Sequence, residues 1–160
     1  MRILGIDPAL KITGFGIIDV RNNSLCLYRA GAIITSSKEL LPLRLEKIYR
    51  ALCKLIDESK PKVMVVEKIY VHYHHTTTAY ILGQARGLVL LAAAQNKIPL
   101  IEYSATRVKK AIVGRGLASK QQVQKMVLGT LNLNTVPEYM DVTDALALAI
   151  AYKQISGVKV

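Results

Sequence analysis

The segment Val63–Glu67 constrains the fold most, because it is a short apolar run, rich in β-branched valine, with no alternating polar residue. A strand with one face in water alternates apolar and polar residues, whereas a strand covered on both faces does not. The run therefore predicts a central strand with helices on both sides of its sheet. It ends at Glu67, a charged residue at the carboxyl end of a buried strand.

Strand patterns also precede and follow this segment. The first three are joined by short connections, including the turn Arg21–Ser24, and they predict an antiparallel meander. The predicted strands run over Arg2–Asp7, Gly14–Val20, Leu25–Thr35, Val63–Glu67 and Leu100–Tyr103.

Helical patterns fill most of the remaining chain, with Pro42 tolerated only near the start of the first helix. The order of the elements predicts an α/β fold, with a mixed five-stranded sheet (meander plus parallel strands) flanked by helices. Residues 1–160 are expected to form a single domain. The predicted helices run over Lys38–Glu58, Thr76–Asn96, Ala105–Val113, Ser119–Leu131 and Asp141–Ser156.

The charge balance favours an anionic partner, because 22 Lys and Arg face 11 Asp and Glu, a formal net charge of +11. Nucleic acid suits this excess better than a membrane surface, since no basic amphipathic membrane helix is visible. The longest apolar runs are far shorter than the roughly 20 residues of a membrane span. Because Met1-Arg2 leads directly into a strand, no signal peptide is expected, and the protein is predicted to be cytoplasmic.

Two of the acidic residues, Asp7 and Glu67, close strongly apolar strands. If those strands are parallel neighbours, both side chains face one crevice. Asp141 and Asp144 are spaced to project from one face of a helix. Four carboxylates within about 4 Å repel by roughly 4 kcal/mol per pair at an effective dielectric of 20, so they need cations or protons between them. Two Mg²⁺ ions here predict a nuclease that hydrolyses phosphodiester bonds.

Each of these carboxylates also has an ordinary structural explanation. Asp141 and Asp144 at the start of an apolar helix are typical of N-capping, and Asp7 before Pro8 is typical of a turn. An unpaired charge at the end of an apolar strand is costly, however, and this favours the metal interpretation for Asp7 and Glu67.

Five segments that occur in order along nearly the whole chain resemble the RuvC family of Holliday junction resolvases. Gly5–Pro8 alone is also similar to other ribonuclease H-like nucleases and to actin-like kinases, so the resemblance depends on the set. An actin-like ATPase is disfavoured, because the chain is too short for a two-domain cleft. The segments are Gly5-Ile6-Asp7-Pro8, Thr13-Gly14-Phe15-Gly16, Val65-Val66-Glu67, Gly83-Gln84-Ala85-Arg86-Gly87 and Asp141-Val142-Thr143-Asp144-Ala145-Leu146-Ala147.

The resemblance implies a ribonuclease H-like fold, a homodimer and Mg²⁺-dependent paired incision of four-way DNA junctions. Mn²⁺ is an alternative ion, and a branch-migration motor complex is a further expected partner. The resemblance assigns catalytic and metal-binding roles to Asp7, Glu67, Asp141 and Asp144, and a catalytic role to Lys120. The expected DNA contacts are Tyr70, Arg86, Lys109, Arg115 and Lys120.

The residues themselves give partial support to these DNA contacts. The basic stretch Arg107–Lys125 suits phosphates, although single lysines are also typical of solvated helix faces. Lys120 follows the flexible link Gly114–Gly116, which allows a close approach of backbone to DNA. Tyr70 lies between a strand and a helix, where its ring can stack on unpaired bases or simply pack within a loop.

Zinc is a weaker prediction than magnesium. His72, His74 and His75 are clustered, but no cysteine is near and no fourth ligand is evident. Cys26 and Cys53 are far apart and lie in apolar patterns, so both are predicted to be reduced, buried thiols.

Two residues depart from the family pattern. Ala9 stands where a glycine is usual, and Lys68 follows Glu67 where glutamine is frequent. The helix segment Leu88–Ala94 is apolar nearly all round and suits a core helix or a dimer seam equally.

Two alternative functions remain: a ribonuclease H-like nuclease that acts on structured RNA, and a non-catalytic DNA-binding protein of the same fold.

Overall fold

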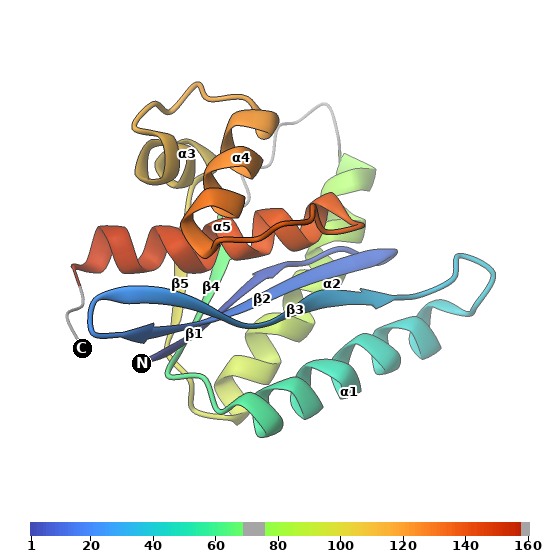
Figure 1. The fold of residues 1–160 in the computed structure, drawn as a ribbon. Coiled ribbons are helices and arrows are strands. Elements are labelled where there is room, and N and C mark those ends of the chain that lie inside the picture. The colour runs from blue at the N-terminus through green and yellow to red at the C-terminus, as the bar shows by residue number, and fades with distance from the viewer. Residues whose placement is uncertain (69–75, 158–160) are drawn as a thin grey trace.

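A five-stranded sheet forms the frame of the molecule, and the computed structural model describes residues 1–68 and 76–157. The strands lie in the order β3-β2-β1-β4-β5 (Figure 1). The first three pair antiparallel, whereas β4 is parallel to both β1 and β5, so the predicted mixed sheet is confirmed. The strands are β1 (Arg2–Asp7), β2 (Ile12–Arg21), β3 (Ser24–Ile34), β4 (Val63–Glu67) and β5 (Leu100–Tyr103).

The helices of the described residues form a layer on each side of the sheet. α1 and α2 pack on one face, and α3, α4 and α5 pack on the other (Figure 1). None of these helices combines the length and the apolar character that crossing a membrane requires. The helices are α1 (Leu41–Ser59), α2 (Thr76–Gln95), α3 (Ala105–Val113), α4 (Lys120–Leu131) and α5 (Met140–Ser156).

Strand β4 contributes to both hydrophobic cores. Val65 is buried in the core under α3, α4 and α5, and Val66 is buried in the core under α1 and α2. Successive side chains of a strand point to opposite faces, and each fully buried valine stabilises the fold by about 1.5–3 kcal/mol. The uniform apolar run Val63–Val66 is therefore explained by the two helical layers, as predicted.

Caps define the first turns of the two short helices on the α5 side. The Ser104 side chain accepts a hydrogen bond from the Arg107 N–H at the start of α3. Ser119 and Gln122 form a reciprocal capping box at the start of α4. As a result, Lys120 occupies the first position of α4, and its direction is set by a capped turn.

Two predicted boundaries differ from the structure by more than one residue. α1 begins at Leu41 rather than Lys38, because Pro42 has no N–H to donate and fits only in the first helical turn. β2 begins at Ile12 rather than Gly14, since its pairing with β3 continues to the end of that strand.

The prediction of buried cysteines is wrong. Both thiols are free, but Cys26 is exposed and Cys53 is only partly buried. Cys26 lies on β3, an edge strand whose first half is mostly exposed. An apolar pattern marks a buried position only where other elements cover the strand, and at Cys26 they do not.

Helix α5 touches the sheet through glycines. A Cβ atom built on Gly5 would lie 2.0 Å from the main-chain oxygen of Ala145, and one on Gly14 would lie 2.1 Å from that of Asp141. Non-bonded atoms do not approach this closely, so a side chain at either position displaces the helix. The helix that carries Asp144 can therefore pack closely on β1 and β2 because Gly5 and Gly14 have no side chains.

Gly5→Ala is expected to destabilise the fold by about 1–3 kcal/mol or more, because overpacking against helix backbone forces a main-chain shift. Gly129→Ala is the matched control, since Gly129 is exposed on α4 and a Cβ there meets nothing within 4 Å. This control should gain up to about 1 kcal/mol from helix propensity. Urea unfolding measures both, and a Gly5→Ala protein as stable as the parent would contradict the close seating of α5.

Candidate active site

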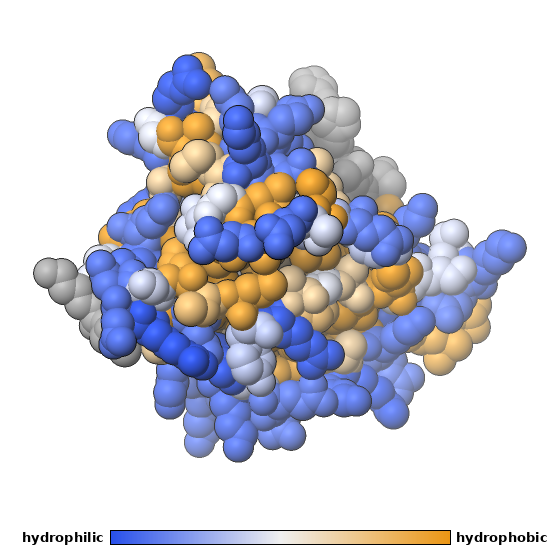
Figure 2. Space-filling view, in the orientation of Figure 1, coloured by the Kyte–Doolittle hydropathy of each residue, from blue (hydrophilic) through white to orange (hydrophobic). Residues whose placement is uncertain are grey.

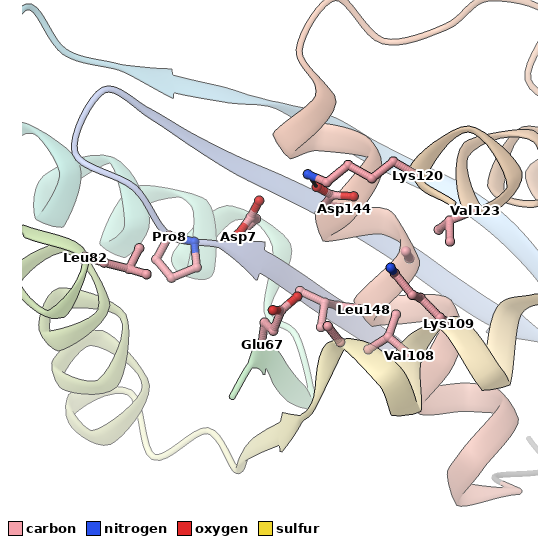
Figure 3. Close-up of a pocket in the computed structure, with 12 residues that line it drawn as sticks. Asp7, Pro8, Glu67, Leu82, Val108, Lys109, Lys120, Val123, Asp144 and Leu148 are labelled. Carbon is pink, nitrogen blue, oxygen red and sulfur yellow. Dashed lines mark hydrogen bonds and ion pairs between the residues drawn. The ribbon is translucent and has the colours of Figure 1, made fainter. Parts of the chain in front are cut away.

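Asp7 and Glu67 stand at the carboxyl ends of neighbouring parallel strands. β1 and β4 pair with Ile6 opposite Val66, so the next residue of each strand is a carboxylate. Both carboxylates line one cavity with Asp144 of α5, as Figure 3 shows. The crevice inferred from the two strand ends is therefore present, and it is closed on one side by α5.

The cavity has a volume of about 280 Å³ and a mixed lining. Its apolar wall includes Leu82 of α2, Val108 of α3, Val123 of α4 and Leu148 of α5 (Figure 3). No sequence pattern marks these residues, because apolar side chains recur at the same helical spacing in a core and in a cavity wall. Four helices thus converge on the ends of two strands.

Asp141 lies farther from the cavity than the other three carboxylates. It does not line the cavity, although its charge is one of those that raise the pKa of Asp7. The cause is the course of α5, which sets Asp141 against Gly14 of β2 and Ala145, one turn later, against Gly5 of β1. The structure therefore brings Asp7, Glu67 and Asp144 together and leaves Asp141 at the edge.

Burial and mutual repulsion act on the strand-end carboxylates. The pKa of Asp7 is raised to about 7, first by burial and then by the charges of Asp144, Asp141 and Glu67. The pKa of Glu67 is also raised, again first by burial and then by Asp144. The site therefore holds more negative charge than its own cations neutralise.

The carboxylates of the cavity are suitable ligands for a hard divalent cation, although they lie farther apart than the ligands of a bound ion do. Carboxylate oxygens are the ligands that Mg²⁺ and similar ions prefer, and a cation would relieve the repulsion that raises the pKa of Asp7. Within residues 1–68 and 76–157, no three His, Cys, Asp or Glu side chains already stand as closely as metal ligands do. The expected convergence within about 4 Å would thus require rotation of these side chains toward an ion.

Two lysines oppose this negative charge. Lys120 Nζ lies 3.2 Å from Asp144 Oδ2, and the charge of Asp144 is the first cause of the raised pKa of Lys120. Lys109 of α3 lines the same cavity, and both lysines lower the pKa of Glu67 against the effect of burial (Figure 3). Sequence reasoning placed both lysines near the reacting phosphate, and the structure places them beside the carboxylates.

The turn after Asp7 is fixed by side chains. Thr13 Oγ1 donates to the Ala9 carbonyl at 2.6 Å and accepts from the Ala9 N–H at 3.3 Å. The Leu10 carbonyl accepts from Arg44 Nη2 at 3.0 Å and from the Thr35 hydroxyl. Ala9 does not adopt a positive φ, so alanine replaces the usual glycine without backbone strain.

The other expected DNA contacts lie in different surroundings. Arg86 Nη1 donates to the Glu67 carbonyl at 2.6 Å, and Arg86 also forms an ion pair with Glu102 of β5. Arg115 is exposed on the link between α3 and α4. Tyr70 lies outside the described residues. Sequence reasoning missed Glu102, although a charge within the short strand Leu100–Tyr103 was a signal that a partner was needed.

Comparison with known proteins matches the sequence of this chain to a family of nucleases. The family model described as crossover junction endodeoxyribonuclease RuvC covers residues 3–152. The crossover junction endodeoxyribonuclease RuvC of Geobacter metallireducens is 43% identical over 159 residues, which are 99% of this chain and 96% of the relative. That of Brevibacillus brevis is 42% identical over 154 residues, which are 96% of this chain and 92% of the relative.

A solved structure gives the same result. T. thermophilus RuvC in complex with Holliday junction substrate superposes with a TM-score of 0.91 at 30% sequence identity, covering 98% of this chain and 94% of that chain. The ribonuclease H-like α/β fold that the sequence implied is confirmed. With its strand-end carboxylates and flanking lysines in place, this chain belongs to the RuvC family of crossover junction endodeoxyribonucleases, the resolvases of Holliday junctions.

Proposed function

We propose that this chain resolves four-way DNA junctions by metal-dependent hydrolysis of two symmetry-related phosphodiester bonds. The observation that carries this proposal is the cavity in which Asp7, Glu67 and Asp144 face Lys109 and Lys120. Carboxylates that hold divalent cations, beside lysines that neutralise phosphate, are what metal-assisted phosphodiester hydrolysis requires. Similarity to a RuvC solved with a Holliday junction substrate supports the junction as the substrate.

The metal ligands in this proposal are Asp7, Glu67 and Asp144, with Asp141 completing the set from the edge of the cavity. We propose Mg²⁺, as two ions, with Mn²⁺ as a substitute. Such ions, when bound, supply Lewis-acid stabilisation of the phosphate and activation of the attacking water. The chain's own part is to orient the carboxylates, and the apolar wall with Val108 and Leu148 limits the access of bulk water.

The lysines have a different part from the carboxylates. Lys109 and Lys120 both line the cavity, so a phosphate placed against the carboxylates also meets two ammonium groups. Their fixed charges would neutralise the negative charge that grows on the phosphate in the transition state. Lys120 already pairs with Asp144, which fixes its ammonium group at the cavity. Arg115 and Tyr70 are proposed as outer contacts to the junction arms and to opened bases.

A homodimer formed through α2 is part of the proposal, because paired incision needs two sites in matching geometry. One side of α2 is buried at Ala85, Val89, Ala92 and Ala93. The other side exposes Tyr80, Leu90 and Leu91. Gly83 and Gly87 lie one turn apart and have open space around them, so a second helix can approach closely. A branch-migration motor that delivers the junction is proposed as a further partner.

Removing single carboxylate charges should abolish cutting and preserve binding. Asp7→Asn, Glu67→Gln and Asp144→Asn keep the side-chain shape but remove a ligand charge, and they leave the DNA surface more positive. We expect cutting to fall at least about a hundredfold, as for lost transition-state contacts, while junction binding without metal stays or tightens. Cutting is measured in Mg²⁺ on labelled junction, linear duplex and RNA hairpin in parallel, and binding by gel shift.

The control for these variants is Asp57→Asn, which removes the same charge from an exposed position on α1. It should cut like the parent, and Asp141→Asn should lose less activity than the other three, because Asp141 does not line the cavity. Near-normal cutting by both Asp7→Asn and Glu67→Gln would overturn the metal-site assignment. Preferential cutting of the RNA hairpin would instead favour the alternative of an RNA nuclease.

Asp7 should make the metal-free protein less stable at higher pH. Since its pKa is raised to about 7 in the folded state, the folded state binds more protons than the unfolded state between pH 4 and 7. Stability therefore falls as pH rises through this window. Asp7→Asn removes the effect and should gain on the order of 3 kcal/mol at pH 8, and less than half of that at pH 5. Urea unfolding in EDTA measures this, and an equal gain at both pH values would argue against it.

Charge on the exposed side of α2 should break the dimer. Leu91→Asp places a carboxylate where two copies of the apolar face would meet, so we expect light scattering at micromolar concentration to change from dimer to monomer. Leu43→Asp is the matched control, because Leu43 is an exposed leucine on α1 away from this face. A parent protein that is monomeric and fully active under these conditions would refute the symmetric dimer.

A further inference from the structure

We propose that Arg86 is a positioning residue for Glu67 and acts from behind the active site rather than on the DNA. This inference rests on the proposed function, since it concerns a residue that would hold the metal. Arg86 Nη1 donates to the main-chain carbonyl of Glu67 at 2.6 Å. Its Nη2 forms an ion pair with Oε1 of Glu102. One guanidinium thus joins helix α2 to the ends of two strands.

The ion pair lies on the opposite face of the sheet from α5. β4 and β5 pair with Val66 opposite Glu102, so Glu102 flanks the residue before Glu67. Val66 and Leu100 pack into the core under α1 and α2, and alternation along β5 puts Glu102 on the same face as Leu100. Arg86 therefore reaches the Glu67 main chain from the α2 side, while the Glu67 carboxylate lines the cavity on the other side.

The surroundings of Arg86 leave little room for a phosphate. Its side chain is 13% exposed, and it does not line the cavity that holds Asp7 and Asp144. A phosphate would have to displace either Glu102 or the Glu67 carbonyl to reach the guanidinium. The geometry thus assigns Arg86 a role different from the DNA contact expected from the sequence.

The guanidinium is suited to this role because its donors form a rigid planar fork that serves two acceptors at once. Glu67 needs such support, since it ends its strand and is repelled by the charge of Asp144. The next residue is also held, because the Lys68 N–H donates to the Tyr103 carbonyl at 2.8 Å. A misplacement of a catalytic group by 1 Å can reduce a rate by about a hundredfold.

The test compares Arg86→Met, Arg86→Lys and Glu102→Gln on junction DNA in Mg²⁺. We expect Arg86→Met to lower kcat by about tenfold to a hundredfold, while KM and gel-shift affinity stay within about twofold of the parent. Arg86→Lys should be intermediate, because one ammonium cannot serve both acceptors in the fork geometry. Glu102→Gln should also lower kcat, and Arg86→Met/Glu102→Gln should be no worse than Arg86→Met, because the two residues act as a unit.

Lys62→Met is the charge-matched control. Lys62 is exposed just before β4, at the far end of the strand from Glu67, and its loss should leave kcat and KM unchanged. If Arg86 contacted DNA instead, Arg86→Met would weaken binding and reduce the slope of log affinity against log salt by about one. Glu102→Gln would then leave cutting unchanged or improve it. Either of these results overturns the positioning role.

Two further measurements do not depend on cutting. Exchange of the Lys68 amide hydrogen should be about tenfold faster in Arg86→Met if the end of β4 loosens. Mn²⁺ binding to the protein without DNA, followed by electron paramagnetic resonance, should weaken several-fold, and urea unfolding identifies any variant that fails to fold. A parent protein that does not cut junctions would refute the proposed function alone. Parent-like Lys68 exchange together with parent-like kcat in Arg86→Met would refute the positioning role alone.

Discussion

The contact between α5 and the glycines of β1 and β2 is the constraint on which the candidate active site depends. At Gly5 and Gly14 the helix backbone itself meets the sheet, with no side chain between them. α5 is also buried from Val142 to Ala151, apart from Asp144, so it cannot tilt without opening the core. On the face of the molecule that Figure 2 shows, hydrophobic residues gather in the middle and hydrophilic residues surround them. The position of Asp144 is therefore set by the packing of α5, and its ion pair with Lys120 is a secondary contribution.

The carboxylates that this packing brings together oppose folding. Burial and the neighbouring acids raise the pKa of both Asp7 and Glu67, which means that the charged site is destabilised in the folded protein. Two hydrophobic cores, one on each side of the sheet, stabilise the fold and offset the repulsion between these carboxylates. A bound cation or the protonation of Asp7 would reduce this repulsion. The proposed affinity of the site for cations and the destabilising repulsion between its carboxylates thus have one electrostatic cause.

Much of this site was predictable because it depends on strand ends. Apolar runs that stop at Asp7 and at Glu67 located β1 and β4 with their correct bounds, and parallel pairing then placed the two acids together. The position of Asp141 was less predictable, since helical spacing cannot tell which strand lies under each turn of α5. The exposure of Cys26 was missed for a related reason: the sequence does not reveal which strand is the sheet edge.

Contacts to the main chain were the least predictable part, because any residue can accept them and no sequence pattern marks them. Arg86 was expected to contact DNA, and no sequence pattern indicated the contacts that the structure gives it, the Glu67 carbonyl and Glu102. The turn at Ala9 shows the same principle, since Thr13 holds its main chain and makes a glycine unnecessary. One face of the sheet therefore presents the carboxylates of the candidate site, while Arg86 binds the Glu67 main chain from the other face. A substitution behind the sheet can alter cutting without touching any group that meets the DNA.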